Sequence, residues 1–405
     1  MDEWSSALGD DTFRQLRLNS PATGRWFPAL RDLSWYITKY NFPYADLFFS
    51  PHLERVSIYM SLAWRNSEVP PEILPAITST ISALPGPTLQ YLFISVDYRR
   101  MPWAYFKESL SSVVLRCGQS LTEFTSPIPL TDAAVNHLIR LPHLRVWHIE
   151  NPPPSYSASP LPLVFPPLTE LTFGESAGCG WLSLFERLEG RASTMQGVTP
   201  LFRMKESLES LNIETIFGPM TNSLFASPIQ IFRNLTYLNV EVYCHEDGRG
   251  QCTFKLNDDH VTKLAMALSQ LDYLQLGHPC FENTCATTVA CLLPISVYCV
   301  KLQSLEIHFN TTNIIEDFKN ISEEPEFQEL RSLPRCPVSY LDVYLTPLTL
   351  DEPGLKTVAE GMVDIFPSLE HCEGLEEVWD EVCEILRHVK ASSVSVTPDP
   401  LPASV

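Results

Sequence analysis

The segment GESAG, residues 174–178, is the strongest candidate for chemistry in this sequence. It matches the pattern Gly-x-Ser-x-Gly, in which a sharp turn between a strand and a helix exposes a serine nucleophile. Ser176 could attack an acyl carbon with the help of a downstream acid and histidine. However, no HGG-like oxyanion segment lies upstream, and no downstream histidine is better placed than its neighbours. A serine esterase that uses Ser176 is therefore the alternative hypothesis, and a glycine-rich turn is the favoured interpretation.

Two groups of cysteines could be drawn as metal sites. The first consists of Cys280, Cys285, Cys291 and Cys299, with His278 nearby. Its spacings lack the tight pairs that open most zinc sites, and free cysteine in an apolar helical run packs as a small hydrophobic residue. The second group, Cys244, His245 and Cys252, brackets a glycine-rich loop and is equally weak. Phosphate-loop, GxGxxG and HExxH motifs are also absent from the sequence, so we expect no enzyme, no cofactor and no metal.

The charge of the chain restricts its partners. The 405 residues carry a formal net charge of −20, whereas nucleic-acid binders need clustered Lys and Arg to displace counterions. Residues 316–384 hold 18 Asp or Glu, against only Lys319, Arg331, Arg335 and Lys356. We therefore exclude nucleic acid as a partner and favour basic proteins as ligands.

The termini and the cysteines indicate the compartment. Residues 1–10 show no basic region followed by an apolar run, and no stretch of about 18 apolar residues occurs in the chain. The 11 cysteines are an odd number without a dense framework, which suits reduced thiols. We expect a cytoplasmic or nuclear protein without a membrane segment.

A short apolar pattern repeats along the chain: a leading apolar residue is followed by others three and five positions later. FRNLTYLNV from Phe232 is a clear copy. The leading residues are Leu30, Leu53, Leu89, Leu121, Leu144, Leu168, Leu208, Leu235, Leu271, Leu302 and Val338, with a degenerate start near Phe13 and a fading copy at Leu369. The residues three and five positions on share one side of a short strand. One such strand cannot bury that side alone, so stacked copies must share a core.

Helices are expected between the strands, because several segments begin with a good capping residue. Thr131-Asp132, Asn257-Asp258-Asp259 and Asp351-Glu352-Pro353 each precede a helical pattern. The prediction is an α/β solenoid with a curved parallel sheet on its concave side and helices and loops on its convex side. We expect about twelve irregular repeats in one domain over residues 1–390, followed by a disordered tail over 391–405.

The repeat resembles the LxxLxLxxN pattern of leucine-rich repeats, and its irregular length is similar to the repeat region of F-box proteins. LTDAAVNHLIRLPHLRVWHIENPPP and FPPLTELTFG resemble a family of F-box-like proteins from mushroom-forming fungi. The resemblance covers Phe13 to about Val389 and implies an irregular leucine-rich-repeat solenoid that binds proteins. It also implies a place as the substrate receptor of an F-box-type ubiquitin ligase.

Two departures from the family pattern matter. The asparagine expected eight positions after the leading residue is replaced in most copies, and Asn310 is the exception. In the family an F-box precedes the repeats, whereas in this sequence the repeats begin almost at once. VPPEILPAI from Val69 echoes an F-box opening, but it falls where a repeat helix is due. Binding of the ligase adaptor is therefore implied only if an F-box is present, and a remnant that binds nothing is a further hypothesis.

The candidate binding residues follow from the alternation of strand side chains. Positions two, four and six after each leading residue should line the concave face, which solenoids use for binding. Tyrosine is favoured at recognition surfaces, and glutamate suits a ligand with Lys or Arg. The candidates are Tyr36, Tyr59, Tyr91, Glu150, Glu214, Tyr237, Glu241, Tyr273, Tyr340 and Tyr344. The alternative interpretation is that these tyrosines only cover neighbouring repeats.

Overall fold

The computed structural model describes thirteen segments of the chain. They are residues 10–20, 26–37, 41–60, 74–96, 105–149, 166–174, 206–215, 229–242, 256–277, 286–323, 325–343, 348–374 and 377–394. The chain forms two compact units, Met1–Leu208 (unit 1) and Glu209–Val405 (unit 2), and each is considered by itself.

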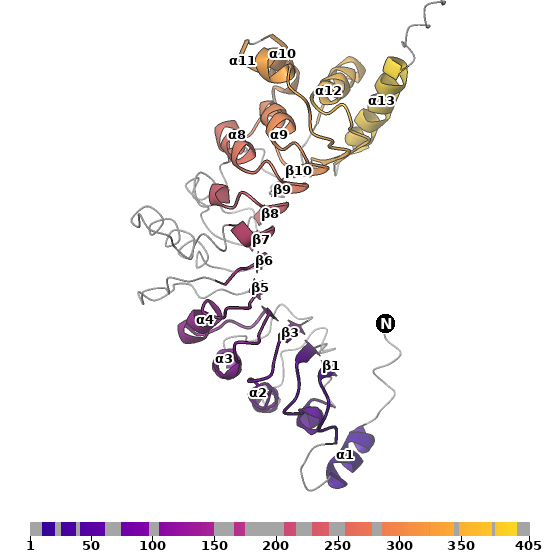
Figure 1. The fold of residues 1–405 in the computed structure, drawn as a ribbon. Coiled ribbons are helices and arrows are strands. Elements are labelled where there is room, and N and C mark those ends of the chain that lie inside the picture. Colours follow the sequence, from indigo (N-terminus) through magenta and orange to yellow (C-terminus); the bar gives the residue numbers. More distant parts are fainter. Residues whose placement is uncertain are drawn as a thin grey trace, which may run out of the picture. The chain divides into compact units, whose positions relative to one another are not determined.

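Unit 1 contains a ladder of parallel strands that pair in chain order. The strands are β1 (Asp32–Ile37), β2 (Arg55–Met60), β3 (Tyr91–Val96), β4 (Glu123–Ser126), β5 (Val146–Ile149) and β6 (Glu170–Phe173). The helices are α1 (Asp10–Leu18), the 3-10 helix η1 (Phe42–Phe48), α2 (Leu74–Ser82), α3 (Lys107–Arg116) and α4 (Asp132–Leu138). Helix α3 packs between α2 and α4, and Figure 1 shows these three helices on one side of the strands.

Unit 2 repeats the arrangement. Its strands are β7 (Ser210–Thr215), β8 (Tyr237–Val242), β9 (Tyr273–Gly277), β10 (Ser304–Ile307), β11 (Tyr340–Asp342) and β12 (His371–Glu373), again parallel and in chain order. Its helices are η3 (Ile229–Ile231), α8 (Asp258–Ala267), η4 (Val289–Cys291), α9 (Leu292–Tyr298), α10 (Ile314–Glu323), α11 (Pro325–Arg331), α12 (Glu352–Ile365) and α13 (Glu377–Val394). Helix α8 packs on α9, and α12 packs on α13.

The leading residues of the repeat form the core from Leu53 onward, whereas Leu30 is only partly buried. Every one from Leu53 to Leu369 is at most 1% exposed, and the fading copy at Leu369 is followed by a paired strand, β12. The degenerate start near Phe13 is wrong as a strand, because Phe13 lies on helix α1 and packs there against Trp35 and Tyr44. The predicted α/β class and the parallel sheet of a leucine-rich-repeat solenoid are confirmed.

A line of backbone hydrogen bonds runs through each unit just after the leading residues. In unit 1 the N–H of Gln90 donates to the carbonyl of Glu54 and the N–H of Thr122 donates to that of Gln90, both at 2.7 Å. In unit 2 the N–H of Asp272 donates to the carbonyl of Thr236 at 2.8 Å. These bonds join successive repeats without using the side chain of an asparagine.

The predicted helix caps are present. Each capping side chain accepts a hydrogen bond from a backbone N–H three residues further on, which satisfies a donor that the first turn leaves unpaired. The pairs are Thr131 with Ala134 at 3.4 Å, Asn257 with His260 at 3.0 Å and Asp351 with Gly354 at 3.0 Å. All three predicted helices, α4, α8 and α12, therefore begin where their sequences indicated.

The bounds of two helices can be compared with the segments predicted from the sequence. Helix α13 continues to Val394, so residues 391–394 of the predicted tail are helical. Helix α2 begins at Leu74, so the described part of the fragment VPPEILPAI lies in a repeat helix. No helix in the described segments has the length and hydropathy needed to cross a membrane.

The contact between α10 and α12 gives a test of the packing. A Cβ atom added at Gly361 would lie 2.4 Å from the ring of Phe318, a side chain that is 5% exposed. Gly→Ala inside a helix normally stabilises by about 1 kcal/mol. Here we expect Gly361→Ala to lower the free energy of unfolding by about 1–3 kcal/mol, because the added methyl group overpacks the core. Urea denaturation measures the change.

Two controls accompany this substitution. Glu360→Ala, at the exposed neighbouring position, should change stability by no more than about 0.5 kcal/mol. Gly361→Ala should also cost less in a Phe318→Leu background, where the ring is absent. Equal cost in both backgrounds would show that the contact with Phe318 is not responsible.

Candidate functional site

The two faces of each ladder differ in what covers them. Along β2 and β4, every second side chain is buried and the others are partly or fully exposed. The buried side chains follow the leading residue at positions three, five and seven, and the others follow at two, four and six. We call the face that carries the second set the open face. By strand register, the open face carries eight of the ten candidate residues, namely Tyr36, Tyr59, Tyr91, Glu214, Tyr237, Glu241, Tyr273 and Tyr340. The other two, Glu150 and Tyr344, lie outside the described residues.

An aromatic cluster occupies the open face of unit 1. The rings of Tyr36 and Tyr59 stack with centroids 4.6 Å apart and planes 12° apart. Phe93 continues the cluster, with its centroid 5.4 Å from that of Tyr59 and 6.4 Å from that of Tyr91. Tyr36 at its end remains 56% exposed. Strands β1, β2 and β3 thus present a row of rings that is incompletely covered by the protein.

A cation sits on this cluster. The guanidinium carbon of Arg55 lies 4.4 Å from the centre of the Tyr91 ring, within the range of a cation–π interaction. Nε of Arg55 is 3.6 Å from a carboxylate oxygen of Asp32. The open face can therefore hold a guanidinium group between an aromatic ring on one strand and a carboxylate on another.

The open face of unit 2 also carries stacked tyrosines. Tyr237 and Tyr273 have ring centroids 4.5 Å apart and planes only 5° apart. The hydroxyl of Tyr273 donates to the carboxylate of Glu306 at 2.6 Å and lies 2.7 Å from Oε1 of Gln275. These hydrogen bonds join Tyr273 to polar side chains of β9 and β10.

Burial, and then the carboxylates around them, raise the pKa values of these tyrosines. Burial raises the pKa of Tyr273, and its hydrogen bond to Glu306 raises it further. Burial, followed by the charges of Glu306 and Glu214, raises the pKa of Tyr237. Burial together with neighbouring carboxylates raises the pKa of Tyr340 to about 12. Among these phenols, Tyr273 donates its hydroxyl hydrogen to Glu306 and Tyr340 donates its own to Glu373.

Acidic residues dominate the rest of this face. They are Glu214, Glu241, Glu306, Asp342 and Glu373. Among the described open-face positions of β7 to β12 there is no Lys or Arg, and His308 and His371 are the only basic side chains. Burial lowers the pKa of His308, which favours its neutral form. We call this surface the acidic tyrosine face.

Several residues of these surfaces are missing from the sequence candidates. Phe93, Glu306, Asp342 and Glu373 all stand four positions after a leading residue. That position belongs to the open face by the same alternation that identified the candidates. The signal was therefore available in the sequence, whereas the ring stacking that joins Phe93 to Tyr59 becomes visible only with the strand register.

The enzyme-like and metal-like motifs gain no support from the structure. Ser176 and the cysteines at 244, 252, 280 and 285 lie outside the described residues. Cys291 and Cys299 are fully buried, and burial raises the pKa of Cys299 to about 12, so this thiol packs as part of the core. In the described part of the chain, no three His, Cys, Asp or Glu side chains are grouped closely enough to hold a metal ion.

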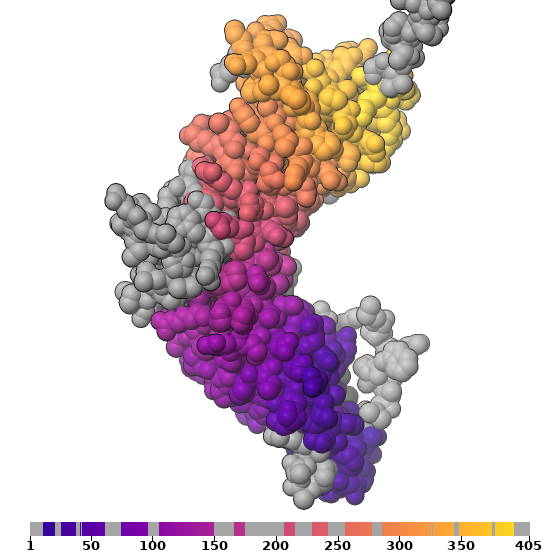
Figure 2. Space-filling model, viewed as in Figure 1, coloured from indigo at the N-terminus to yellow at the C-terminus, as the bar shows by residue number. Residues whose placement is uncertain are grey.

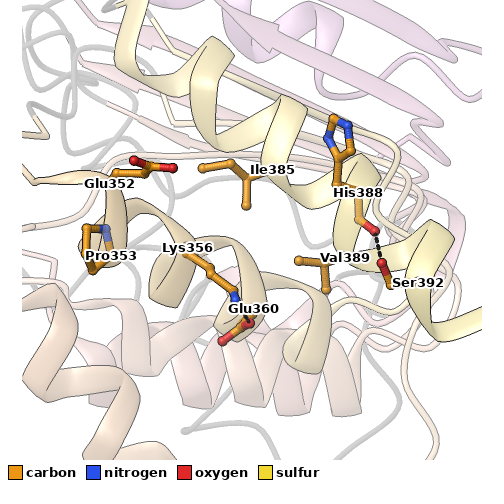
Figure 3. A pocket seen from close by; sticks show the side chains of 8 residues that line it. All are labelled: Glu352, Pro353, Lys356, Glu360, Ile385, His388, Val389 and Ser392. Atoms are coloured by element: carbon orange, nitrogen blue, oxygen red, sulfur yellow. Dashed lines mark hydrogen bonds and ion pairs between the residues drawn. The ribbon is translucent and has the colours of Figure 1, made fainter.

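A groove lies between α12 and α13, away from the strands. Figure 2 shows these helices as part of the orange and yellow surface of unit 2, and Figure 3 shows the residues that line the groove. Ile385 and Val389 supply its apolar wall, while Lys356 and Glu360 form an ion pair of 3.8 Å on the other side. His388 and Ser392 also line the groove, but the Ser392 hydroxyl donates to the backbone carbonyl of His388 at 2.9 Å rather than to its imidazole ring.

The pair Arg55 and Tyr91 can be tested by a double-mutant cycle. We expect Arg55→Met and Tyr91→Leu to be coupled by about 0.5–1 kcal/mol in the free energy of unfolding, because the guanidinium lies on the ring. The matched control is the cycle of Arg55→Met with Asp32→Asn. Coupling in that exposed ion pair should disappear in 1 M salt, whereas coupling to Tyr91 should remain. No measurable coupling between Arg55 and Tyr91 would contradict the arrangement.

Comparison with known proteins gives only distant similarity. No family model matches the chain, and no curated protein matches it either. Among solved structures, the Rad7 and Elc1 complex of yeast is similar, with 13% sequence identity, a TM-score of 0.40 and coverage of 91% of this chain and 79% of that one. The leucine-rich-repeat-containing protein LegL7 of Legionella pneumophila has 9% identity, a TM-score of 0.34 and coverage of 96% and 95%, respectively.

Proposed function

We propose that this chain is a non-enzymatic scaffold that recognises other proteins through the open faces of its ladders. The observation that carries the proposal is the presence of stacked aromatic rings on both open faces. Tyr36 and Tyr59 form one stack and Tyr237 and Tyr273 form the other. Aromatic side chains bring a large apolar area and few rotatable bonds, and they dominate the energetics of recognition surfaces.

Packing of the repeats against one another does not by itself explain why aromatic rings lie on the open faces. The core is already built by the side chains at positions three and five, such as Leu238 and Val240, which are fully buried. The open face needs only side chains that tolerate water, yet unit 1 places a row of rings there and leaves Tyr36 56% exposed. Grouped apolar surface of this kind on a soluble domain marks an interaction site.

Charge favours a basic protein as the ligand. The chain carries a net charge of −20, and the acidic tyrosine face adds a local concentration of carboxylates in unit 2. The negative electrostatic potential of these charges speeds association with a basic partner, and it weakens as salt is added. Nucleic acid does not fit this potential, because its phosphates repel carboxylates.

The finer proposal is that the scaffold serves as the substrate receptor of an F-box-type ubiquitin ligase. It is supported by the resemblance of residues 130–154 and 165–174 to the repeats of F-box-like proteins. Affinity purification of the tagged full chain from its own cells, followed by mass spectrometry, tests it. Recovery of the ligase adaptor in stoichiometric amounts would support the receptor role, and its absence beside other specific partners would leave a free-standing scaffold.

Replacing the exposed rings tests the scaffold function. We expect the triple variant Tyr36→Ala, Tyr59→Ala, Tyr91→Ala or the double variant Tyr237→Ala, Tyr273→Ala to lose at least one specific partner by about tenfold. The reason is that truncating an aromatic residue central to an interface costs about 2 kcal/mol or more. Quantitative mass spectrometry of the purified complexes measures the loss.

The matched control lies on the helices. Leu115 on α3 and Met266 on α8 are large apolar side chains with 47% and 58% exposure, and neither is on a strand. The variant Leu115→Ser, Met266→Ser should retain every partner. Partners that survive both open-face variants and disappear from this helix variant would refute recognition through the open faces.

A further inference from the structure

We propose that the acidic tyrosine face binds an arginine-bearing basic segment of a partner protein, with a guanidinium group held against the Tyr237–Tyr273 pair. This inference rests on the proposed scaffold function and names the chemistry of its ligand. It commits to arginine rather than to positive charge in general.

Unit 1 provides an internal example of the contact. Arg55 lies with its guanidinium carbon 4.4 Å from the centre of the Tyr91 ring and its Nε 3.6 Å from the carboxylate of Asp32. Tyr91 stands two positions after its leading residue, and Tyr237 and Tyr273 stand at the equivalent position in their own repeats. The strand geometry of this chain therefore accepts a guanidinium on a tyrosine at that position when a carboxylate lies nearby.

Unit 2 reproduces the ring and the carboxylates of this example. The Tyr237 and Tyr273 rings lie parallel, and the charges of Glu214, Glu241 and Glu306 all act on Tyr237. Glu214 pairs in register with Glu241 on the neighbouring strand. Because β7 to β12 contribute no Lys or Arg at their described open-face positions, the net charge of the face is strongly negative and complements a cationic ligand.

Two amides on the same face add acceptor atoms. Asn212 and Asn239 are register neighbours on β7 and β8, and Asn239 is only 6% exposed. The side-chain oxygen of each is buried without a hydrogen-bond donor. A buried acceptor without a donor is costly, and the Asn212 amide is held in place because its nitrogen donates to Glu214 at 2.8 Å. Such a surface suits a ligand rich in donors.

The guanidinium group meets these requirements better than an ammonium group. It has five N–H donors in a plane, stacks flat on aromatic rings and is weakly hydrated. An ammonium group is compact and strongly hydrated, so it gains less from a stacked pair of rings. The stacked tyrosines therefore distinguish arginine from lysine, whereas the carboxylates attract both.

The face accommodates a segment rather than a single side chain. Its acidic residues extend over strands from β7 to β12. Five strand-to-strand intervals of about 4.8 Å correspond to roughly 24 Å, the length of about seven extended residues. A peptide of seven residues is thus a suitable probe.

The experiment uses the full chain with fluorescently labelled hepta-arginine and hepta-lysine peptides, and anisotropy measures the dissociation constants at low and moderate salt. We expect hepta-arginine to bind about fivefold more tightly than hepta-lysine, the difference that favourable stacking would supply. Both affinities should fall as salt is added. Tyr237→Ala, Tyr273→Ala should remove the preference for arginine while leaving binding of hepta-lysine within twofold.

Three further variants separate the contributions. Tyr237→Phe, Tyr273→Phe keeps the rings and should keep the preference for arginine, which guards against loss of folding in the alanine variant. Glu241→Gln, Glu306→Gln should weaken both peptides together. Glu316→Gln, Glu323→Gln removes two exposed acids of α10, outside the face, and should change neither affinity beyond the small effect of net charge.

The outcomes distinguish this inference from the scaffold function. Equal binding of the two peptides, or a preference for arginine that the alanine variant retains, would overturn the inference even if the open-face variants lose their cellular partners. Binding weakened as much by the α10 variant as by the Glu241, Glu306 variant would also overturn it, because attraction would then be non-specific. The scaffold function itself falls only if cellular partners ignore both open faces.

Discussion

The pairing of each strand with its neighbour in a fixed parallel register is the constraint on which the rest of this structure depends. A strand of three to six residues, such as β11 or β2, cannot bury its apolar side alone. Register places Leu238 beside Leu274 and Leu305 beside Leu341, so adjacent repeats complete one another's core. Because side chains alternate along a strand, the same register places every second and fourth residue on the opposite face. The core is thereby specified by one set of positions and the ligand surface by another.

This separation explains how the repeats tolerate very unequal lengths. Successive leading residues are 23 apart between Leu30 and Leu53 and 40 apart between Leu168 and Leu208, yet the strand pairs on either side remain parallel. The backbone bonds immediately after the leading residues, such as that from Gln90 to Glu54, depend on no particular side chain. Extra residues are therefore accommodated between strands, where added loop length costs little entropy. The usual asparagine is dispensable for the same reason, and Asn310, where it is present, accepts a local bond from the N–H of Thr312.

Local signals made much of this fold predictable from the sequence. Apolar residues three and five positions after Leu271 identify a strand, and Asn257 before an apolar helical pattern identifies a helix start. The segment at Phe13 resembles a repeat strand because Leu16 and Leu18 follow three and five positions on, yet three apolar residues do not separate a helix from a strand, and the segment is helical. The candidate site was predictable only as a list of positions. That Phe93 meets Tyr59, or that Tyr273 donates to Glu306, depends on register between strands that are more than thirty residues apart in the sequence.

The two open faces differ in one chemical respect that bears on selectivity. In unit 1, Arg55 supplies a cation to the aromatic cluster and pairs with Asp32, so one ring there already has a basic side chain against it. In unit 2, the tyrosine pair lies among carboxylates, and burial together with the charges around the pair raises the pKa of both phenols. A neutral phenol donates to a carboxylate while its ring keeps the electron-rich face that attracts cations. Because an ordinary tyrosine is already protonated at physiological pH, the feature that distinguishes unit 2 is geometric: the Tyr273 hydroxyl donates to Glu306 while its ring stacks on that of Tyr237.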